Sequence, residues 1–314
     1  MKFFRQQNCR FKYPVVSMGT FDGVHLGHQK LLSVLKARAE AAGGEAIVIT
    51  YYHHPLEIIH KKTFPYLLTE LSRKEELLKQ HGADRVLYLD FDEAMADMSP
   101  VEFLQTIILE EIKAKELVVG YDTHFGKFRQ GDYDFLKQNA ARFNYLVELV
   151  EPFQIHNRII SSSLIRDFVR EGDMVDAARC LGRNYSVAGW VASGQRIGRE
   201  LGFPTINVQP ADPNKLLPGI GVYICEVILK GKTWQAVTNI GYSPTLKKNN
   251  YKEIETHILD FSRSIYDEKV EIVFHRKIRD EIDFPGKDEL VREIERDVLK
   301  TREFFKTKSI MPSC

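Results

Sequence analysis

The 314-residue chain has few cysteines, no long apolar run and almost no net charge. Its four cysteines lie far apart without a CxxC pair, so they indicate neither a zinc ribbon nor a disulfide framework. No apolar stretch reaches the roughly 18 residues of a membrane span, and the N-terminus turns polar before any run of secretory length. We therefore expect a cytoplasmic protein that is neither exported nor inserted into a membrane.

The chain also has no marked excess of positive or negative charge, because Lys and Arg total 44 while Asp and Glu total 43. Proteins dedicated to nucleic acid carry a basic field. We therefore expect small-molecule partners, no nucleic acid and no membrane, and a monomer or weak oligomer. A hydrophobic content of 44% and a charged content of 28% exclude a disordered chain. The length predicts two domains of about 150 residues each.

Between residues 14 and 150, apolar runs typical of strands alternate with helical patterns, which predicts βαβ units and a parallel sheet. Helices are predicted from about Gly27, after Ser72 and after Ser99. Ser72 with Glu75, and Ser99 with Glu102, have the spacing of a capping box. The predicted strands cover residues 14–19, 45–52, 85–91, 116–120 and 144–150.

The second half of the chain follows a different pattern. Two short amphipathic helices are predicted within 161–183, and they end at Gly172 and Gly182, which suit a left-handed C-terminal position. From Tyr185 onward, short alternating runs predict an antiparallel sheet or barrel, followed by a long helix from about Lys287. The predicted parts are an α/β domain at 1–160, a helical connector at 161–183 and a second domain at 184–314.

The string GTFDGVHLGH, residues 19–28, leaves the first predicted strand, turns through glycines and enters a helix. Ligands bind at such points of an α/β sheet. His25 and His28 share a face of the first helical turn, beside the free N–H groups of a helix N-terminus, and could stabilise a departing pyrophosphate. A bare HxxH pair more often marks surface or capping residues. A zinc site would need a third ligand at a telling distance, which is missing.

The whole string resembles the GxFDGxHxGH signature of the nucleotidyltransferase superfamily. Three later segments are similar to the adenylyltransferase half of bacterial bifunctional riboflavin kinase/FMN adenylyltransferases. His54-Pro55 resembles part of FxPHP, 120–131 resembles GxDFxFGxxRxG, and 160–166 resembles ISSTxIR. Thr123 and His53 depart from these patterns, so the packing around the flavin or adenine is expected to differ. The resemblance implies catalytic roles for His25, His28 and Arg166, phosphate contacts from Gly19, Phe21, Asp22, Gly23, Ser162 and Ser163, and flavin contacts from His54, Asp122, Phe125 and Arg129.

A second chemical pattern is GQRIGRELGFPTIN, residues 194–207, a glycine-rich basic turn that leads into a strand. Its glycines would let backbone N–H groups approach phosphate, and Thr205 and Asn207 offer Mg²⁺ oxygen ligands on one face of the strand. A hairpin loop is the alternative. The segment resembles the GRxLGFPTxN hallmark of riboflavin kinases, and 254–261 resembles ExHLLDF. This resemblance implies ATP contacts from Gly194, Gly198, Arg199 and Gly202, Mg²⁺ ligation by Thr205 and Asn207, a catalytic base in Glu255, and flavin contacts from Asn239 and Arg279.

The resemblance covers about residues 12–306 and implies an α/β plus β architecture. Residues 1–160 would form a Rossmann-like FMN adenylyltransferase domain, and 184–314 a six-stranded antiparallel β-barrel of riboflavin kinase type with a long C-terminal helix. The implied function is phosphorylation of riboflavin to FMN and adenylylation of FMN to FAD, both with ATP and Mg²⁺. Two alternatives remain open: a flavin-binding regulator of the same fold with one or both sites inactive, and a transferase with another acceptor, such as a cytidylyltransferase.

Overall fold

The computed structural model describes residues 3–5, 10–55, 67–192, 201–242 and 252–310, with side chains described up to 308. Contacts divide the chain into two compact units, Met1–Ser162 and Ser163–Cys314. Gly194, Gly198 and Arg199 lie outside the described residues. The predicted functional boundaries, at 160 and 183, stay predictions.

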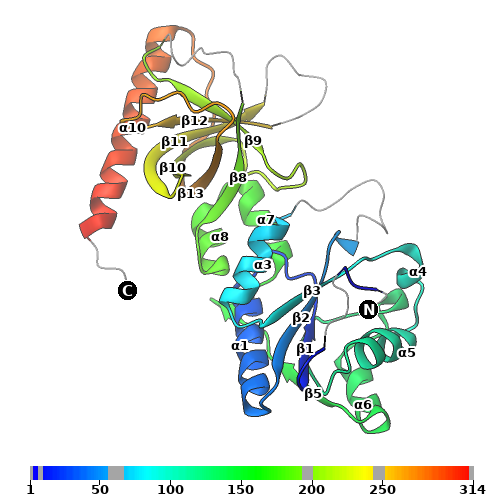
Figure 1. Ribbon diagram of the computed structural model, residues 1–314. Coiled ribbons are helices and arrows are strands. Elements are labelled where there is room, and N and C mark those ends of the chain that lie inside the picture. Colours follow the sequence, from blue (N-terminus) through cyan, green and yellow to red (C-terminus); the bar gives the residue numbers. More distant parts are fainter. Residues whose placement is uncertain (1–2, 6–9, 56–66, 193–200, 243–251, 311–314) are drawn as a thin grey trace. The chain divides into compact units, whose positions relative to one another are not determined.

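The first unit contains a five-stranded parallel sheet with the strand order β3-β2-β1-β4-β5, which confirms the predicted α/β fold (Figure 1). Its strands are β1 (Pro14–Met18), β2 (Glu45–Tyr51), β3 (Arg85–Leu89), β4 (Glu116–Gly120) and β5 (Leu146–Val150). The described helical segments are α1 (Leu26–Ala41), α3 (Leu71–Gln80), α4 (Glu93–Ala96), α5 (Pro100–Phe103), the π-helix η1 (Leu104–Glu111), the 3-10 turn η2 (Lys127–Arg129) and α6 (Tyr133–Phe143). A small hairpin, β6 (Gln154–Ile155) and β7 (Arg158–Ile159), follows.

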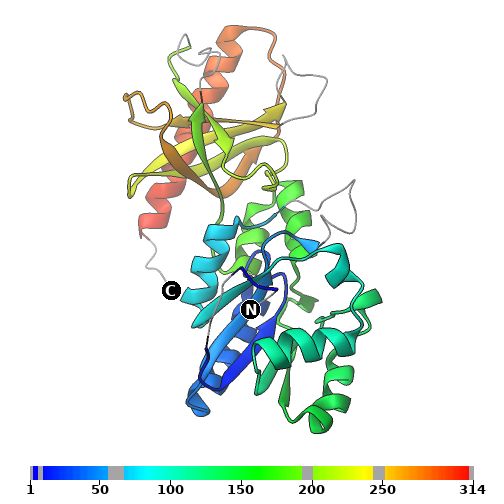
Figure 2. The same ribbon diagram turned by 45° about the vertical axis from the view of Figure 1, so that its right-hand side comes forward.

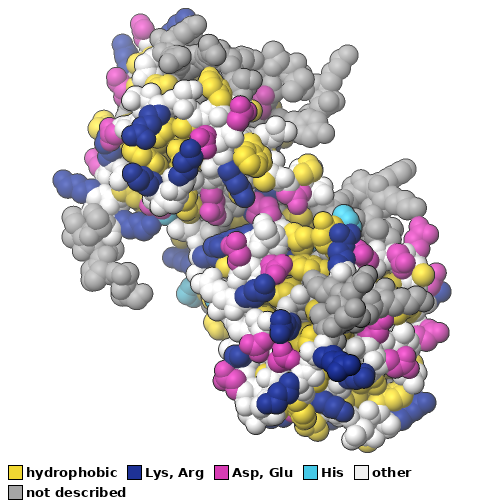
Figure 3. Space-filling view, viewed as in Figure 1, with side chains coloured by type: hydrophobic (Ala, Val, Ile, Leu, Met, Phe, Trp, Pro, Cys, Tyr) yellow, Lys and Arg dark blue, Asp and Glu magenta, His cyan; other side chains and the backbone are white. Residues whose placement is uncertain are grey.

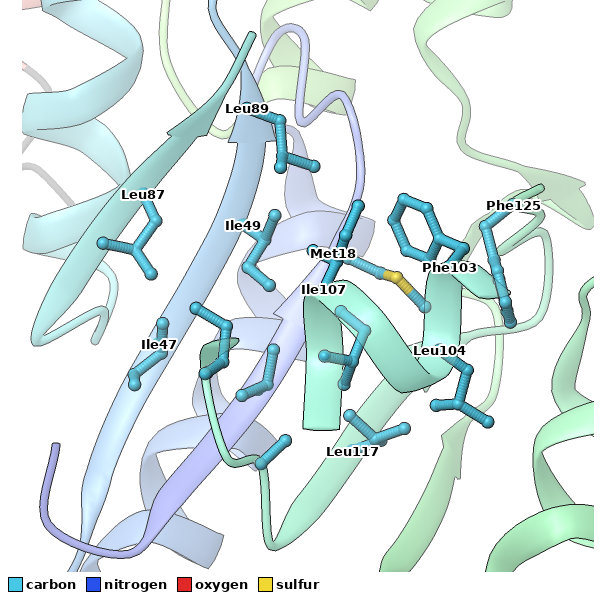
Figure 4. Close-up of a cluster of buried hydrophobic side chains, with 14 of the residues drawn as sticks. Met18, Ile47, Ile49, Leu87, Leu89, Phe103, Leu104, Ile107, Leu117 and Phe125 are labelled. Atoms are coloured by element: carbon cyan, nitrogen blue, oxygen red, sulfur yellow. The ribbon is translucent and has the colours of Figure 1, made fainter. Parts of the chain in front are cut away.

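Apolar side chains cover both faces of this sheet, as expected for parallel strands. On one face, α1 and α3 bury a cluster that includes Val15, Val48 and Leu32. On the other face, α5, η1 and α6 cover a second cluster, and Figures 1 and 2 show these two layers of helices. Figure 4 shows how the side chains of the second cluster meet, with labels on Met18, Ile47, Ile49, Leu87, Leu89, Phe103, Leu104, Ile107, Leu117 and Phe125.

One of the two predicted capping boxes is present. The Oγ of Ser99 accepts a hydrogen bond from the N–H of Glu102 at 3.3 Å, and the Glu102 carboxylate accepts one from the N–H of Ser99 at 2.8 Å. The prediction for Ser72 is wrong. Helix α3 begins one residue before it, with Glu70 as an extended N-cap residue, so Ser72 lies inside the helix and cannot cap it.

The second unit contains a closed barrel with the strand order β10-β11-β12-β9-β8-β13, in which every described pairing is antiparallel. This confirms the predicted six-stranded barrel. Its strands are β8 (Tyr185–Ala192), β9 (Thr205–Pro210), β10 (Gly221–Leu229), β11 (Lys232–Tyr242), β12 (Lys252–Ile258) and β13 (Lys269–Arg279). Its helices in the described residues are α7 (Ser162–Glu171), α8 (Met174–Leu181) and α10 (Lys287–Ile310).

The long helix α10 is attached to the barrel by polar pairs as well as apolar contacts. The guanidinium of Arg279 donates to Asp297 at 2.9 Å, and burial raises the pKa of that carboxyl although the guanidinium opposes the shift. On β13, His275 lies 2.8 Å from the carboxylate of Glu226, and its ring meets Phe305 edge-on. These contacts fix the helix beside the outer surface of the barrel.

Surface charge on the face drawn in Figure 3 is mixed, because Lys and Arg side chains alternate with Asp and Glu over the described residues. None of the helices in the described part of the chain combines the length and the hydropathy that crossing a bilayer requires.

Two candidate active sites

The first candidate site lies at the switch point of the parallel sheet. Strands β1 and β4 are neighbours, but the chain continues from them towards opposite edges, β2 on one side and β5 on the other. Ligands of α/β sheets bind outside the carboxyl ends of such a strand pair. The segment 19–28 follows β1, and the segment 120–131 begins at the end of β4. Topology therefore places two of the predicted motifs at one edge of the sheet.

The turn after β1 is tightly held and strained. Phe21, Gly23 and Val24 all have positive φ angles, of 49°, 87° and 40°. Such conformations cost about 1 kcal/mol or more in a residue with a side chain and are typical of functional sites. The buried carboxylate of Asp22 accepts hydrogen bonds from the N–H groups of Leu68 and Thr69 at 3.0–3.1 Å. This geometry gives Asp22 a role in holding the turn, and its predicted phosphate contact stays a prediction.

His25 and His28 are brought together as expected. Their rings stack with centroids 3.6 Å apart, and Phe21 lies beside His28 at 5.1 Å. His25 is the N-cap residue of α1, because its Nδ1 accepts a hydrogen bond from the N–H of His28 at 3.3 Å. A neutral His25 ring with Nδ1 as acceptor carries its proton on Nε2. Nε2–H is therefore the group through which this ring would donate to a phosphate oxygen.

Gly27 sets the position of the His25 ring. A Cβ at Gly27 would lie 3.1 Å from two atoms of that ring, closer than an ordinary contact. We expect Gly27→Ala to displace the ring and to lower the rate of the adenylyl transfer that the resemblance implies about tenfold, while the implied kinase activity is unchanged. Alanine favours the helix by up to about 1 kcal/mol, which offsets a similar cost if the displaced ring no longer caps α1, so the melting temperature should change little. Steady-state rates with FMN and ATP, together with thermal melting, check both; a wild-type rate would contradict this role of Gly27.

The other residues predicted for the adenylyltransferase site differ in burial and in the element that carries them. The Ser162 hydroxyl, at the end of the first unit, donates to the Asp22 carbonyl at 2.8 Å. Ser163 is exposed, and Arg166, one turn into α7, is only 8% exposed. Phe125 is buried in the cluster of Figure 4, where it packs against Phe103 and Phe135. Three predicted residues lie on the loops that follow β2 and β4: the partly buried His54 and the exposed Asp122 and Arg129.

The second candidate site lies on the outer face of the barrel. Along β12, Ile254 and Thr256 are buried, so the alternate residue Glu255 points outward. Glu255 stands directly opposite Asn207 of β9 and Asn239 of β11. Cross-strand partners share a face with Cβ atoms about 5 Å apart. The predicted base, one predicted Mg²⁺ ligand and one predicted flavin residue therefore form a row across three strands, and Thr205 lies on the same face as Asn207.

The electrostatics of this row suit a proton acceptor. Partial removal of water, and the nearby carboxylates of Glu253 and Glu281, raise the pKa of Glu255. Glu281 also accepts a hydrogen bond from the Nδ2 of Asn239 at 3.2 Å. The Asn239 Oδ1 is buried and has no hydrogen-bond donor among the described residues. It can therefore accept a hydrogen bond from a substrate.

Arg279, a predicted flavin contact, binds other residues of the protein through its guanidinium. Its guanidinium is held by Asp297 and by the carbonyl of Asp280, and it lies over the ring of Phe284. The arrangement fixes the end of β13 against α10. Gly202, with a φ of 85°, ends the described part of the predicted ATP turn just before β9.

Sequence reasoning missed three residues that support these sites. Gly27 was part of the quoted motif, but its contact with His25 depends on the ring's position. Glu281 was not among the predicted site residues, and its bond to Asn239 joins segments far apart in sequence. Lys74, in a charged helical segment, has the sequence signature of a solvent-exposed residue yet is buried.

Both halves of the chain have the folds of nucleotide-dependent transferases, the first that of α/β nucleotidyltransferases and the second that of riboflavin kinase barrels. The family model for FAD synthetase matches residues 9–164, and the model for riboflavin kinase matches residues 181–305. The chain belongs to the family of bifunctional riboflavin kinase/FMN adenylyltransferases.

Two curated relatives with that name match this chain over nearly their whole length. The protein from Pseudomonas fluorescens is 36% identical over 92% of both chains. The protein from Escherichia coli K12 is 33% identical over 96% of this chain and 94% of its own. Among solved structures, one described as a macrolide-efflux protein from Streptococcus pneumoniae has a TM-score of 0.85, with 30% identity over 93% of this chain and 94% of its own.

Proposed function

We propose that the barrel transfers the terminal phosphoryl group of ATP to the 5′-hydroxyl of riboflavin, giving FMN and ADP. The observation that carries this proposal is the row of Asn207, Glu255 and Asn239 on one face of the barrel. Glu255 would accept the hydroxyl proton, and its raised pKa moves it towards the working range of a general base. Asn239 would accept a hydrogen bond from the flavin substrate.

The oxygen donors on β9 fit Mg²⁺. Thr205 and Asn207 share a face, and a hydroxyl and an amide oxygen are hard ligands of the kind that this ion accepts. When bound with ATP, the ion would neutralise phosphate charge. The protein's own contribution would be to hold the nucleotide beside Glu255.

The first unit would then transfer the adenylyl group of a second ATP to the phosphate of FMN, giving FAD and pyrophosphate. The stacked His25 and His28 rings at the N-terminus of α1 support this proposal, because their N–H groups and the helix terminus can stabilise charge on the departing pyrophosphate. Arg166 lies in the second unit, and the catalytic role predicted for it stays a prediction. The predicted cytoplasmic location and weak or absent oligomerisation stay predictions.

A single assay tests both reactions. The protein is incubated with riboflavin and Mg-ATP, and FMN and FAD are separated by chromatography over time. We expect FMN to form first and FAD to follow. A separate incubation with FMN and Mg-ATP isolates the second step. Absence of FMN in the first incubation would reject the kinase, and absence of FAD in the second would reject the adenylyltransferase.

The pH dependence of FMN formation should reflect the raised pKa of Glu255. A general base must be ionised, so kcat/KM for riboflavin should decline as the pH falls through that pKa, at a higher pH than an ordinary glutamate's value of about 4.3. Glu281→Gln removes one repelling charge but keeps an acceptor for Asn239. We expect this variant to shift the acid limb to lower pH. An acid limb at the same pH in both proteins would contradict the assignment.

A further inference from the structure

Lys74 in helix α3 is a buried charged residue that neither reaction explains. Only 9% of its surface is exposed. Its Nζ donates to the carbonyl of Thr20 at 3.4 Å, to the hydroxyl of Thr50 at 3.3 Å and to the carbonyl of Tyr51 at 3.4 Å. These three oxygens lie at the carboxyl ends of the neighbouring strands β1 and β2, at the edge where ligands of α/β sheets bind.

The three oxygens belong to segments with different tasks. Thr20 opens the strained turn that leads to His25, on the proposed ATP side. Tyr51 ends β2, and the chain continues from it to His54, a predicted flavin contact. The hydroxyl of Thr50 also donates to the carbonyl of Thr20 at 3.1 Å, which ties the two segments a second time. One cation therefore joins the starts of both ligand-holding segments.

Burial of the Lys74 ammonium group costs free energy, because the charge loses its contact with water. Removal of water lowers the pKa of Lys74 to about 8, although the carboxylate of Asp22 acts in the opposite direction. A methionine would fill similar space without burying a charge. A charged group kept in a low-dielectric position beside a ligand site is typical of a functional role.

We propose that Lys74 is a positioning residue for adenylyl transfer, which holds the turn before His25 and the segment before His54 in the relative placement that the reaction needs. The inference rests on the proposed adenylyltransferase function. It assigns Lys74 no contact with substrate. Its effect should therefore reach both substrates of the first unit and neither substrate of the barrel.

The first test compares Lys74→Met with Lys79→Met. Lys79 lies on the same helix but is exposed and paired with Glu75, so it is a matched control. We expect Lys74→Met to raise the KM for FMN and for ATP and to lower kcat/KM of adenylyl transfer by about 10²-fold, the scale of a 1 Å misplacement. FMN formation by the barrel should be unchanged, as should both reactions in the control. Wild-type kinetic constants in Lys74→Met would overturn the proposal.

The second test is a pH profile. The titratable groups on the Lys74 side of the sheet are Asp22 from the turn and the hydrogen-bonded pair of Glu75 and Tyr88. Only the carbonyl of Tyr51 contacts Lys74, because its side chain packs against the cluster on the opposite face. Burial raises the pKa of Tyr51 to about 12 and that of Tyr88 further, while Lys79 lowers that of Glu75, so these three keep their charge state near pH 8. Wild-type kcat/KM for adenylyl transfer should fall as the pH rises through about 8. Lys74→Gln, which keeps donors without the charge, should lack that decline.

The free energy of unfolding should rise over the same pH range in which the rate of adenylyl transfer falls. The folded pKa of Lys74 lies below the unfolded value of about 10.4, so the folded protein binds fewer protons between these values and gains stability as the pH rises. A merely structural lysine would make activity and stability change together. The same alkaline decline in Lys74→Gln as in wild type would overturn the proposal, even if Lys74→Met fails to fold. Absence of FAD in the wild-type assay would instead reject the adenylyltransferase function, and this inference with it.

Discussion

Glu255→Gln should reduce the rate of FMN formation by about 10²- to 10⁴-fold, while FMN supplied directly is still converted to FAD. Glutamine preserves the size of the side chain and an acceptor oxygen, but it cannot take the proton of the riboflavin hydroxyl. Glu255 is exposed on the outer face of the barrel, so the substitution removes no core contact. Chromatographic rates of FMN and FAD formation, measured separately, check the expectation.

Glu253→Gln is the matched control, because Glu253 lies two residues away on the same strand and face. Removal of the Glu253 charge should leave the kinase rate at neutral pH within a few-fold of the wild-type rate. It should lower the pKa of Glu255, which this charge helps to raise. If Glu255→Gln abolished both reactions in a folded protein, the division of labour between the two units would be wrong. If it abolished neither, the base must be another group.

Local patterns were sufficient for most of the fold. Alternating apolar runs located the strands of both units, and the Ser99 capping box marked the start of α5 correctly because all its bonds lie within four residues. Ser72 offered the same spacing, yet α3 starts before it. Leu68 and Thr69 immediately upstream bind the carboxylate of Asp22, which holds the chain that enters the helix. That long-range contact does not show in the local sequence.

The π-helix from Leu104 to Glu111 was not predicted either. Its apolar residues satisfy an α-helical pattern, and the wider turn shows only in bonds such as that from the N–H of Ile112 to the carbonyl of Ile107. Barrel closure is likewise non-local, because β13 pairs with both β8 and β10.

Some features of the two sites could likewise be predicted from local sequence, and others depend on contacts between distant segments. The motif around His25 and His28 specified a shared helical face, and the two rings are stacked. The alignment of Glu255 with Asn207 and Asn239 depends on strand register between segments up to 48 residues apart, and the motifs carry no register. The role of Lys74 could not be predicted from the sequence, since only tertiary packing distinguishes it from the exposed Lys79 on the same helix. Resemblance identified the chemistry, and the structure added the groups that position it.

His28→Ala should lower the rate of FAD formation from FMN by about 10²- to 10³-fold and leave FMN formation intact, the reverse of Glu255→Gln. Of the two stacked histidines, His28 gives the cleaner test. His25 also caps α1 through its Nδ1, so its removal would cost about 1 kcal/mol of stability in addition to any loss of chemistry. His28 lies inside the helix, where alanine is favoured and its backbone N–H is kept. The lost rate can then be assigned to the imidazole.

His156→Asn supplies the control for this experiment. His156 is an exposed histidine of the same unit, in the β6–β7 turn, with a φ of 49° that asparagine tolerates well. Both reactions should proceed at wild-type rates in this variant. Full adenylyl transfer in His28→Ala would show that the pyrophosphate is stabilised without this ring, and the N-terminus of α1 and His25 would then have to supply that stabilisation. A parallel loss of FMN formation would show that the barrel depends on the first unit, which the separate locations of the two sites do not predict.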